Sequence, residues 1–517
     1  MNAAELIKRG AVYFPNHTGV IFQGQKLTFD QVYRNSNRLA NALLSLGLKK
    51  GDRVAFLLAN SLQSVEIDFA LLLTGIIRVP LNTRLSENEH IHMIKETGAS
   101  ALLYTEEFSE RAAQIKIHCE NLRYFCQMNG STREPWMINM PEFVKGVSEE
   151  EPSVKVHESD IATIQYTSGT TGTLKAAVHT QEIWTAISNN ILSSLDIHEG
   201  DTMLHAAPLT HASGTLVLPH WVSGAANSIL SGFNPEQYLQ TIHHEKPTTL
   251  NLVPTMIVML LSQPNVEQYS FESVRNIIYG ASPMPREALR RGLALWGPKF
   301  VQYYGQTEAP LILSILNKQD HTIGGEEGEE RLLSCGRPVP TASIKIVDEF
   351  GEERQAGEIG EIAVKSSQAM LGYWNEPVLT DETIKDGWVH TRDMGYLDKK
   401  GYLFLVDRKS DMIISGGFNV YPREVEEILY QHPAVMEAAV VGVPDEKWVE
   451  TVKAYVVLKD GQTVSEEELI IFCKEKLASY KKPSSIEFIE SLPKSPVGKV
   501  VRRLLRDPHW EGKERKI

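Results

Sequence analysis

The chain alternates between two hydrophobic patterns over roughly its first 400 residues. Short apolar runs such as residues 54–59 have the length of buried strands, whereas residues 30–46 carry apolar side chains at helical spacing. Strands that alternate with helices in this way favour an α/β fold with largely parallel sheets. The most apolar stretch, residues 69–81, is shorter than the ~20 residues of a membrane-spanning helix and contains Arg78, so we expect no membrane span.

The pattern changes near residue 410, where a polar, glycine-rich and charged segment is typical of a joint between domains. The elements predicted beyond it are a surface helix over residues 423–430, strands over 437–443 and 452–458, and a helix that a capping box at Ser465 and Glu468 opens and that ends near 481–483. In the first of these helices, Val425, Ile428 and Leu429 share one face, and glutamates such as Glu426 lie elsewhere. The segment therefore predicts a small α+β domain.

Composition narrows the class of protein. With 42% hydrophobic and 23% charged residues, the chain resembles an ordinary soluble globular protein. A net charge of −13 argues against a broad nucleic-acid-binding surface, so we expect no nucleic-acid partner. The four cysteines show neither CxxC spacing nor a nearby histidine pair, which indicates thiols in a reducing compartment rather than a zinc site. Because the N-terminus also lacks an apolar leader, we expect a cytoplasmic protein.

The most distinctive local segment spans residues 161–180. A strand-like run ends at Tyr166, and six small residues precede Lys175, namely Thr167, Ser168, Gly169, Thr170, Thr171 and Gly172. Such a loop can approach anionic oxygens closely and offers N–H and O–H donors, to which Lys175 adds a positive charge. The P-loop pattern does not fit, because Leu174 and Ala176 occupy positions that it reserves for Gly and Ser/Thr. A flexible linker is the alternative, but linkers are seldom bounded by an apolar strand and a regular helix, so we predict a phosphate-binding loop.

The string TSGTTG with a lysine three residues on resembles the signature of the adenylate-forming superfamily, which comprises acyl- and aryl-CoA ligases, luciferases and the adenylation domains of peptide synthetases. Further blocks of that pattern follow in order: NLVPTM (251–256), YGASPMP (279–285), YYGQTEAP (303–310), GEIGEIAVKS (357–366), GYWNEP (372–377), WVHTRDMGYLD (388–398), DRKSDMIISGGFNVYPREVE (407–426) and LPKSPVGKVVRR (492–503). The resemblance implies a large N-terminal domain of αβ layers with a distorted β-barrel over residues 1–407, a hinge at 408–411 and an α+β lid over 412–517.

The resemblance also implies an ATP/AMP site. It places Asp393 and Arg408 at the ribose, and Thr307 at the α-phosphate. Glu308 would reach a Mg²⁺ ion, which prefers oxygen ligands and substrate phosphates. The segment Gly280, Ala281 and Ser282 would border the adenine, with Tyr304 stacking on the base and Gly305 allowing a close backbone approach. Taken alone, an aspartate in a turn or a tyrosine beside a glycine is more often structural.

Two further residues would act on the carboxylic acid. Lys499 matches the lysine that stabilises negative charge at the acid carboxylate and the α-phosphate, so that it would be catalytic together with Thr307 and Glu308. His211 matches the position over the acid's carboxylate, in a pocket with Tyr303 and Gly305. Without the match, Lys499 would be a solvated lysine and His211 a packed core histidine.

The implied reaction has two steps and uses ATP, Mg²⁺ and coenzyme A. A small-molecule carboxylic acid would form an acyl-adenylate and pyrophosphate, and after lid rotation the acyl group would pass to the thiol, with Gly416, Gly417 and Phe418 facing the thiol channel. Loading of a carrier-protein phosphopantetheine and activation of a long-chain fatty acid are the alternatives, and a homodimer is left open. An inactive scaffold is disfavoured because the charged groups of the pattern, Lys175 among them, are all present.

Four departures from the common pattern stand out. Leu174 and Ala176 flank the retained Lys175. Arg392 replaces the usual glycine before Asp393 and must point away from the ribose, and Ser410 replaces Asp or Lys at the hinge. Tyr303 occupies a place where many relatives with long or bulky substrates have glycine, which predicts a short cavity and a small aryl or short- to medium-chain acid. A tyrosine that points outward, away from the pocket, is the alternative.

Overall fold

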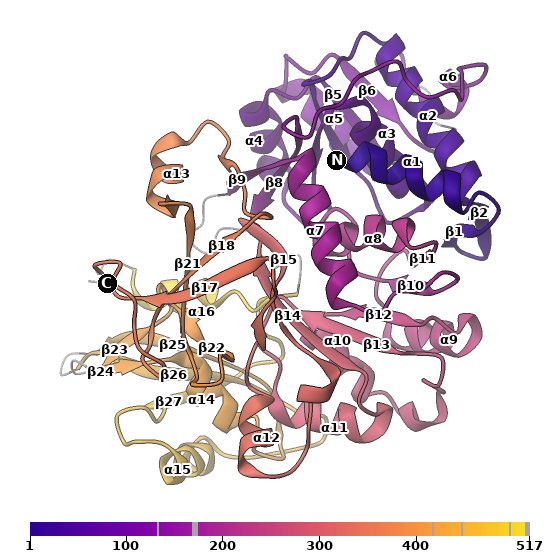
Figure 1. Cartoon of the computed structure of the whole chain (residues 1–517). Helices are drawn as coiled ribbons and strands as arrows, with labels where there is room; N and C mark the ends of the chain where they lie inside the picture. Colours follow the sequence, from indigo (N-terminus) through magenta and orange to yellow (C-terminus); the bar gives the residue numbers. More distant parts are fainter. Residues whose placement is uncertain (132–133, 168–173, 416–417, 446–447, 496–497, 512–517) are drawn as a thin grey trace.

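The chain folds into a large body and a smaller lid that lie side by side (Figure 1). This computed structural model describes residues 1–131, 134–167, 174–415, 418–445, 448–495 and 498–511. The body combines two helix-covered sheets, largely parallel, with a third, antiparallel sheet, which confirms the predicted α/β class. Within the described ranges, no helix is long and apolar enough to cross a membrane.

The first sheet has the strand order β19-β9-β8-β4-β3-β5-β6-β7. Its strands are β3 (Arg53–Leu57), β4 (Ile77–Pro80), β5 (Ala101–Tyr104), β6 (Tyr124–Gln127), β7 (Ile138–Asn139), β8 (Ile161–Thr167), β9 (Lys175–Thr180) and β19 (Gly372–Tyr373). The helices of this region are α2 (Phe29–Ser45), α3 (Leu62–Thr74), α4 (Glu87–Thr97), α5 (Ser109–His118) and α6 (Met140–Phe143). The strand and the helix predicted at residues 54–59 and 30–46 correspond to β3 and α2.

The second sheet has the order β16-β15-β14-β13-β12-β10-β11-β1-β2. Its strands are β1 (Thr18–Phe22), β2 (Gln25–Thr28), β10 (Thr202–His205), β11 (Ala226–Ile229), β12 (Thr249–Leu252), β13 (Asn276–Gly280), β14 (Phe300–Gln306), β15 (Ala309–Leu316) and β16 (Arg337–Pro338). The helices are α1 (Ala3–Tyr13), α7 (Gln181–Ser194), α8 (Val217–Val222), α9 (Pro235–Glu245), α10 (Pro254–Leu261) and α11 (Arg286–Trp296). Because α3 and α7 contact strands of both sheets, they form a shared layer between them.

The third sheet is antiparallel and brings the chain to the lid. Its strands are β17 (Ala342–Val347), β18 (Gly360–Ser366), β20 (Ile384–Lys385), β21 (Trp388–Leu397) and β22 (Leu403–Arg408), and α12 (Glu326–Arg331) and α13 (Pro377–Thr383) belong to the same part of the chain. The strand β22 ends at Arg408 and the first lid strand begins at Ile413, so residues 409–411 of the predicted hinge lie between them and Arg408 is the last residue of β22.

The lid combines a five-stranded sheet with helices, and the two pack around an apolar core of their own. It contains β23 (Ile413–Ser415), β24 (Phe418–Val420), α14 (Pro422–Leu429), β25 (Val435–Asp445), β26 (Val449–Leu458), α15 (Glu466–Lys476), β27 (Ser485–Phe488) and α16 (Arg502–Arg506). The capping box predicted at Ser465 and Glu468 is present at the start of α15.

Three sequence expectations were wrong in detail. The segment predicted as a phosphate loop is followed by β9 and not by a helix, because residues 175–180 pair with β8 and the helix begins only after Thr180, whose side chain caps it. Helix α15 ends at Lys476 and not near residues 481–483, since Leu477 is extended and residues 478–481 close a turn. Glu426 on α14 is 7% exposed, because a buried arginine binds it.

A buried ion pair ties α3 to the first sheet. The Arg78 guanidinium, from β4, donates to Asp68 Oδ1 at 3.0 and 2.5 Å and to Thr163 Oγ1 at 2.9 Å. It also lies over the Trp184 ring of α7, 4.7 Å from the centroid. Arg78 is 3% exposed, so all of these contacts exclude water, and they join two strands of the first sheet to both helices of the shared layer.

Replacing Asp68 by alanine should destabilise the body strongly, because it leaves the Arg78 charge buried without its partner. We expect a loss of ~3–5 kcal/mol in the free energy of unfolding. Chemical denaturation measures it, with Arg34→Ala as the matched control, since Arg34 pairs with Asp30 on the exposed surface of α2 at 2.8 Å. The control should cost no more than about 1 kcal/mol. Equal effects of the two variants would contradict this account of the pair.

Candidate active site

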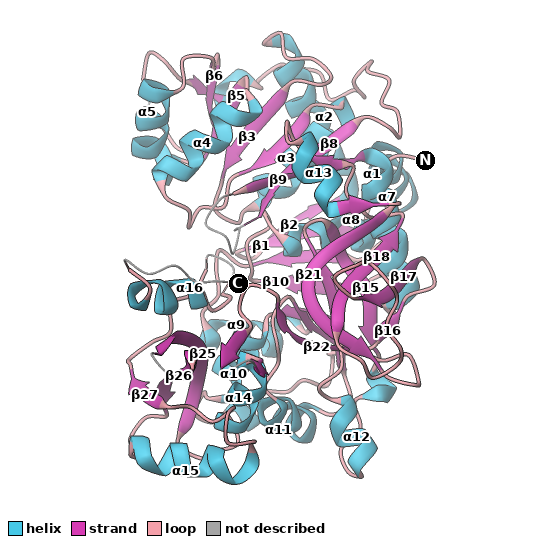
Figure 2. Cartoon of the chain, turned by 90° about the vertical axis from the view of Figure 1, so that its left-hand side faces the viewer, coloured by secondary structure: helices cyan, strands magenta, loops and turns pink. Residues whose placement is uncertain are grey.

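The body and the lid enclose a cavity of about 530 Å³ at the joint between them. Lid elements α14–α16 and β25–β27 lie along one side of the body (Figure 2). Eight of the residues singled out in the sequence line the cavity: Ala281, Ser282, Tyr303, Tyr304, Gly305, Asp393, Arg408 and Lys499. Eight other described candidates lie outside this wall: Thr167, Lys175, His211, Gly280, Thr307, Glu308, Ser410 and Phe418.

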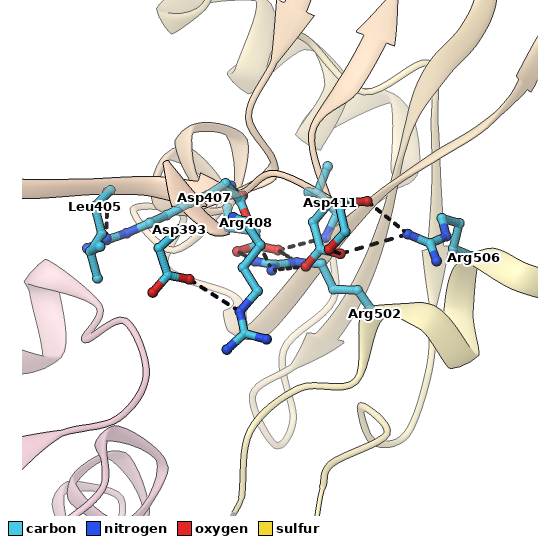
Figure 3. Close-up of polar contacts among 11 residues, drawn as sticks. Asp393, Leu405, Asp407, Arg408, Asp411, Arg502 and Arg506 are labelled. Atoms are coloured by element: carbon cyan, nitrogen blue, oxygen red, sulfur yellow. Dashed lines mark hydrogen bonds and ion pairs between the residues drawn. The ribbon is translucent and has the colours of Figure 1, made fainter. Parts of the chain in front are cut away.

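Asp393 is the centre of a polar cluster on the body side. It lies on β21 directly opposite Arg408 on β22, and the Arg408 Nε is 3.5 Å from Asp393 Oδ1. The Tyr304 hydroxyl, from β14, donates to Asp393 Oδ2 at 2.8 Å. Burial and then the Asp393 charge raise the pKa of the Tyr304 phenol well above its usual value, so the phenol stays a donor. Figure 3 shows the Arg408 and Asp393 side chains pointing toward one another, a fixed carboxylate of the kind that binds a ribose diol.

The Thr307–Glu308 turn joins β14 to β15 and is held from three sides. His179 Nε2 is 2.8 Å from the Thr307 carbonyl, and the Met370 N–H donates to the Glu308 carbonyl at 2.7 Å. The Tyr373 hydroxyl donates to Glu308 Oε1 at 2.6 Å. Burial lowers the pKa of His179 to about 4, so the ring is neutral, and its carbonyl partner requires the proton on Nε2.

Sequence reasoning missed His179 and Tyr373 as supports of this turn. His179 follows Lys175 by four positions on β9, and Tyr373 lies inside the GYWNEP block, but no local pattern says which carbonyl or carboxylate each would meet. Gln306, at the end of β14, is a third omission. It lines the cavity, and its side-chain N–H group has no partner among the described residues.

Glu308 is the candidate for holding Mg²⁺. Only one of its carboxylate oxygens has a hydrogen-bond partner in the described part of the chain, the Tyr373 hydroxyl. The described residues contain no group of three or more His, Cys, Asp or Glu side chains that could enclose a metal ion. A single carboxylate with one available oxygen fits Mg²⁺, which keeps waters and substrate phosphates among its ligands.

Lys499 reaches the cavity from the lid, in the loop between β27 and α16. Its backbone is fixed by Ser495, whose N–H donates to the Lys499 carbonyl at 2.7 Å and whose hydroxyl accepts the Lys499 N–H at 3.2 Å. Burial and the Arg408 charge lower the pKa of Lys499 to about 8, while Asp393 and Glu308 raise it. The ammonium therefore lies among the polar groups that the body presents.

His211 begins the 3-10 turn η2 (Ala212–Leu216) and lies near Lys499. Burial, and then the Lys499 charge, lowers the pKa of His211 to about 4, so its ring is neutral. A buried network holds this turn: Ser213 Oγ lies 2.9 Å from His205 Nδ1, and His205 Nε2 lies 2.9 Å from Asn227 Oδ1. The structure thus brings His211 to the same end of the site as Lys499.

Packing explains two of the predicted glycines and the place of Tyr303. A Cβ at Gly305 would come 2.0 Å from the Leu311 carbonyl oxygen, and one at Gly280 would come 2.4 Å from the Tyr303 carbonyl oxygen. Tyr303 is 6% exposed and packs in an apolar cluster with residues of α7 such as Ile187. Tyr303 therefore belongs both to this apolar cluster and to the wall of the cavity.

Part of the predicted site lies outside the described residues: Ser168, Gly169, Thr170, Thr171, Gly172, Gly416 and Gly417. Thr167 and Lys175, at the two ends of the phosphate loop, are paired across β8 and β9. Lys175 Nζ lies 5.7 Å from the centroid of the Tyr373 ring and thus beside Glu308. Phe418, on the lid, is 58% exposed and packs against Tyr480 with ring centroids 4.8 Å apart.

An ion network fixes the lid against the body at the predicted hinge (Figure 3). Arg502, from α16, donates to Glu426 of α14 at 3.0 and 2.7 Å. The same guanidinium contacts Asp407 at 3.4 Å and Asp411 at 3.3 Å, on the two sides of Ser410. A second arginine, Arg506, donates to the Ser410 carbonyl at 3.2 Å.

Replacing Arg502 by alanine should free the lid from the body, because three carboxylates then lose their shared cation and Asp407 is only 3% exposed. Breaking a buried ion pair of this kind lowers the free energy of unfolding by ~3–5 kcal/mol. Hydrogen exchange should show faster exchange in the lid and at residues 407–411 while β10–β14 keep their protection.

The matched control is Arg503→Ala. Its guanidinium is 41% exposed and lies 3.9 Å from Asp507, so the exchange pattern should stay that of the parent protein. Identical patterns for Arg502→Ala and the parent would show that the network does not set the position of the lid.

Comparison with known proteins agrees with this geometry. A family model described as AMP-binding enzyme matches residues 7–374, and one described as AMP-binding enzyme C-terminal domain matches residues 424–499. The chain is 35% identical over 512 residues to the fatty acid–[acyl-carrier-protein] ligase ScoC of Streptomyces coeruleorubidus, covering 98% of this chain and 96% of that protein. It is also 35% identical over 507 residues to a feruloyl-CoA synthase of an Amycolatopsis species, covering 96% and 97%.

A solved structure extends the likeness to the whole fold. The anthranilate CoA ligase AuaEII, in complex with anthranoyl-AMP, matches with a TM-score of 0.91 at 29% identity, over 98% of this chain and 97% of that one. The motif-based resemblance is confirmed, since the matches span both the body and the lid. The chain is therefore an enzyme that belongs to the AMP-binding, adenylate-forming family.

Proposed function

We propose that this enzyme is an ATP-dependent carboxylic acid:CoA ligase that takes a small aryl or a short- to medium-chain acid. One observation supports the proposal: Lys499 of the lid lines the same cavity as Asp393 and Arg408 of the body. A cation from one domain thus meets a carboxylate of the other. Formation of an acyl-adenylate requires such a convergence, because negative charge accumulates where the acid meets the α-phosphate.

In the first step, a carboxylate oxygen of the acid bonds to the α-phosphorus of ATP while the bond from that phosphorus to the β-phosphate bridging oxygen breaks. Pyrophosphate leaves, and the product is an acyl-adenylate. Asp393 and Arg408 hold the ribose, Thr307 contacts the α-phosphate and Lys499 stabilises the charge at the reacting oxygens. When bound at Glu308, Mg²⁺ would neutralise phosphate charge.

In the second step, a thiol sulfur bonds to the acyl carbon and the bond from that carbon to the phosphate oxygen breaks. The thiol loses its proton, AMP leaves and a thioester remains. Lys499 must withdraw to open a path for the thiol, which a turn of the lid about residues 408–411 provides. Ser410 at this hinge carries no charge. The contacts of Arg502 with Asp407 and Asp411, on the two sides of Ser410, resist the turn of the lid.

Coenzyme A is the proposed thiol, and a carrier-protein phosphopantetheine is the second candidate. The feruloyl-CoA synthase and the carrier-protein ligase ScoC are equally similar to this chain, so identity does not separate the two acceptors. A net charge of −13 gives the chain no overall attraction for a carrier protein, which is itself acidic. Thioester formation with coenzyme A, measured against a panel of acidic carriers, decides between them.

The size of the acid is inferred from Tyr303. The buried side chain packs in an apolar cluster with residues of α7 and lines the cavity, so a longer acyl chain that extended in this direction would meet it. Burial raises the pKa of Tyr303 to about 12, so the phenol is neutral and offers a hydroxyl rather than a charge. An acid that ends at this ring is therefore short or aromatic.

Lys499→Ala should reduce acid-dependent pyrophosphate release by ~10²–10³-fold, in the range found for removal of one oxyanion-stabilising donor. ATP binding should persist, because the ribose contacts lie on the body. The ammonium form of Lys499 is the active one, and its pKa is about 8. In the parent enzyme, kcat/KM for ATP should therefore fall as pH rises through about 8, and Lys499→Arg should move this decline to higher pH. Unchanged pyrophosphate release in Lys499→Ala would refute the assigned role.

A panel of benzoates, short acids and palmitate tests the proposed acid class by pyrophosphate release. The parent enzyme should prefer small acids, and Tyr303→Gly should move the preference toward longer ones by removing the ring from the cavity wall. Tyr303→Phe is the control, since it keeps the ring and should keep the chain-length preference. A parent enzyme that works best on palmitate would overturn the proposal.

A further inference from the structure

His211 lies where the loop that follows β10 meets the η2 turn. Its two neighbours in the chain tie it to the active-site end of the body. The Thr210 carbonyl accepts a hydrogen bond from Gln165 Nε2 at 3.4 Å, and Gln165 belongs to β8, the strand that leads into the predicted phosphate loop. Ala212 packs against the apolar cluster that contains Tyr303, a residue of the cavity wall. The place of this loop and turn therefore decides where His211 lies relative to the cavity.

Asn60 holds the loop from the first sheet. It lies between β3 and α3, and its buried amide binds with both ends. Asn60 Oδ1 accepts the Leu209 N–H at 2.9 Å. Asn60 Nδ2 donates to the Ala207 carbonyl at 3.0 Å and to the Leu230 carbonyl, just after β11, at 3.1 Å. One side chain thus joins the two sheets and fixes the loop on the N-terminal side of His211.

His205 holds the turn from the second sheet. It is the last residue of β10 and is fully buried, and burial lowers its pKa to about 3, so the ring is neutral. Because the Asn227 amide oxygen can only accept, His205 Nε2 carries the proton and donates to it at 2.9 Å. His205 Nδ1 is then free to accept the Ser213 hydroxyl at 2.9 Å. Asn251 Nδ2, from β12, donates to the same hydroxyl oxygen at 3.3 Å. Ser213 of η2 is therefore held by two strands of the sheet below it.

The loop and the turn form one compact unit, so both holds act on His211. A Cβ at Gly214 would come 2.0 Å from the Leu209 carbonyl oxygen, which means that η2 packs directly on the loop residue that Asn60 binds. The Gly214 N–H also donates to the His211 carbonyl at 2.9 Å. Loosening either hold should therefore displace His211.

We propose that Asn60 and His205 are positioning residues for the acid, which set the place of His211 beside the substrate carboxylate from two different sheets. The inference rests on the proposed function, in which His211 lies over that carboxylate. Neither residue is part of the cavity wall, so both act through the loop and the turn and not by contact with a substrate. A hydrogen-bonded buried network holds a single arrangement. A group that is misplaced by about 1 Å at a reacting centre can cost ~10²-fold in rate.

The nucleotide contacts depend on other elements. The proposed ribose contacts, Asp393 and Arg408, lie on β21 and β22, and Tyr304 supports them from β14. None of these strands carries Asn60, His205 or their hydrogen-bond partners in the loop and the turn. A loosened hold should therefore impair the use of the acid and spare the binding of ATP, whereas a general loss of structure would impair both.

Two substitutions each break one hold. Ser213→Ala removes the hydroxyl that His205 binds, and Asn60→Ala removes the amide that binds the loop. Pyrophosphate release, with the best acid found among benzoates, short acids and palmitate, gives kcat/KM for the acid. Each variant should lower it about tenfold, the effect of one broken buried hydrogen bond. The Kd of Mg·ATP, measured by calorimetry without acid, should stay within about twofold of the parent value.

A double-substitution cycle tests whether the effect passes through His211. When His211→Ala is already present, adding Ser213→Ala should change kcat/KM for the acid less than about twofold, because the ring that it would displace is gone. A further tenfold loss in the double variant would mean that Ser213 acts on the acid by another route, and would overturn the inference.

The matched control is Ser36→Ala. Ser36 is a fully buried serine of α2 whose hydroxyl donates to the Val32 carbonyl at 2.8 Å. Its loss should lower the thermal midpoint about as much as Ser213→Ala does, while kcat/KM for the acid stays that of the parent. Unchanged acid use in Ser213→Ala or in Asn60→Ala would overturn the inference, as would an equal loss of ATP affinity. A parent enzyme that releases no pyrophosphate with any acid would instead remove the proposed function.

Discussion

The contact of Arg502 with Asp407 holds the two halves of the active site together. Asp407 belongs to the last strand of the body and Arg502 to the final helix of the lid, and the same guanidinium also binds Glu426 within the lid. Only Val500 and Val501 separate Lys499 from Arg502, so a fixed Arg502 positions the loop that carries Lys499. The cavity, the mixed cluster around Lys499 and the proposed first step all require the lid to be in this position.

The charges of the cleft are arranged for a polyanion. Burial lowers the pKa values of the Lys175 and Lys499 ammonium groups, the Arg408 charge lowers both further, and the Glu308 carboxylate compensates only in part. Tyr304 holds Asp393 and Tyr373 holds Glu308, so both carboxylates are oriented before a ligand enters. The side chains of such a site need to move little when negative charge develops on the substrates. Fixed dipoles and charges accelerate a reaction in this way.

Local patterns predicted much of this architecture. Strand β3, helix α2 and the capping box of α15 follow from periodicity and side-chain capping, which depend on a few neighbouring residues. The ordered motifs located Asp393, Arg408 and Lys499, which the structure brings to one cleft. The prediction of a helix directly after the segment 167–172 was wrong, because pairing with β8 stabilises residues 175–180 as a strand more than their local propensity indicates. Glu426 and His179 could not be assigned either, since their partners lie 76 and 128 residues away.

The central claim is that the acid is activated by joining one of its oxygens to the α-phosphorus of ATP. The most direct measurement uses a substrate acid with ¹⁸O in both carboxylate oxygens, with mass analysis of the AMP released when the thioester forms. The account predicts one ¹⁸O atom in each AMP, because the oxygen that bridges the acyl carbon and the phosphorus leaves with the nucleotide. AMP without label, or label in inorganic phosphate or pyrophosphate, would contradict it.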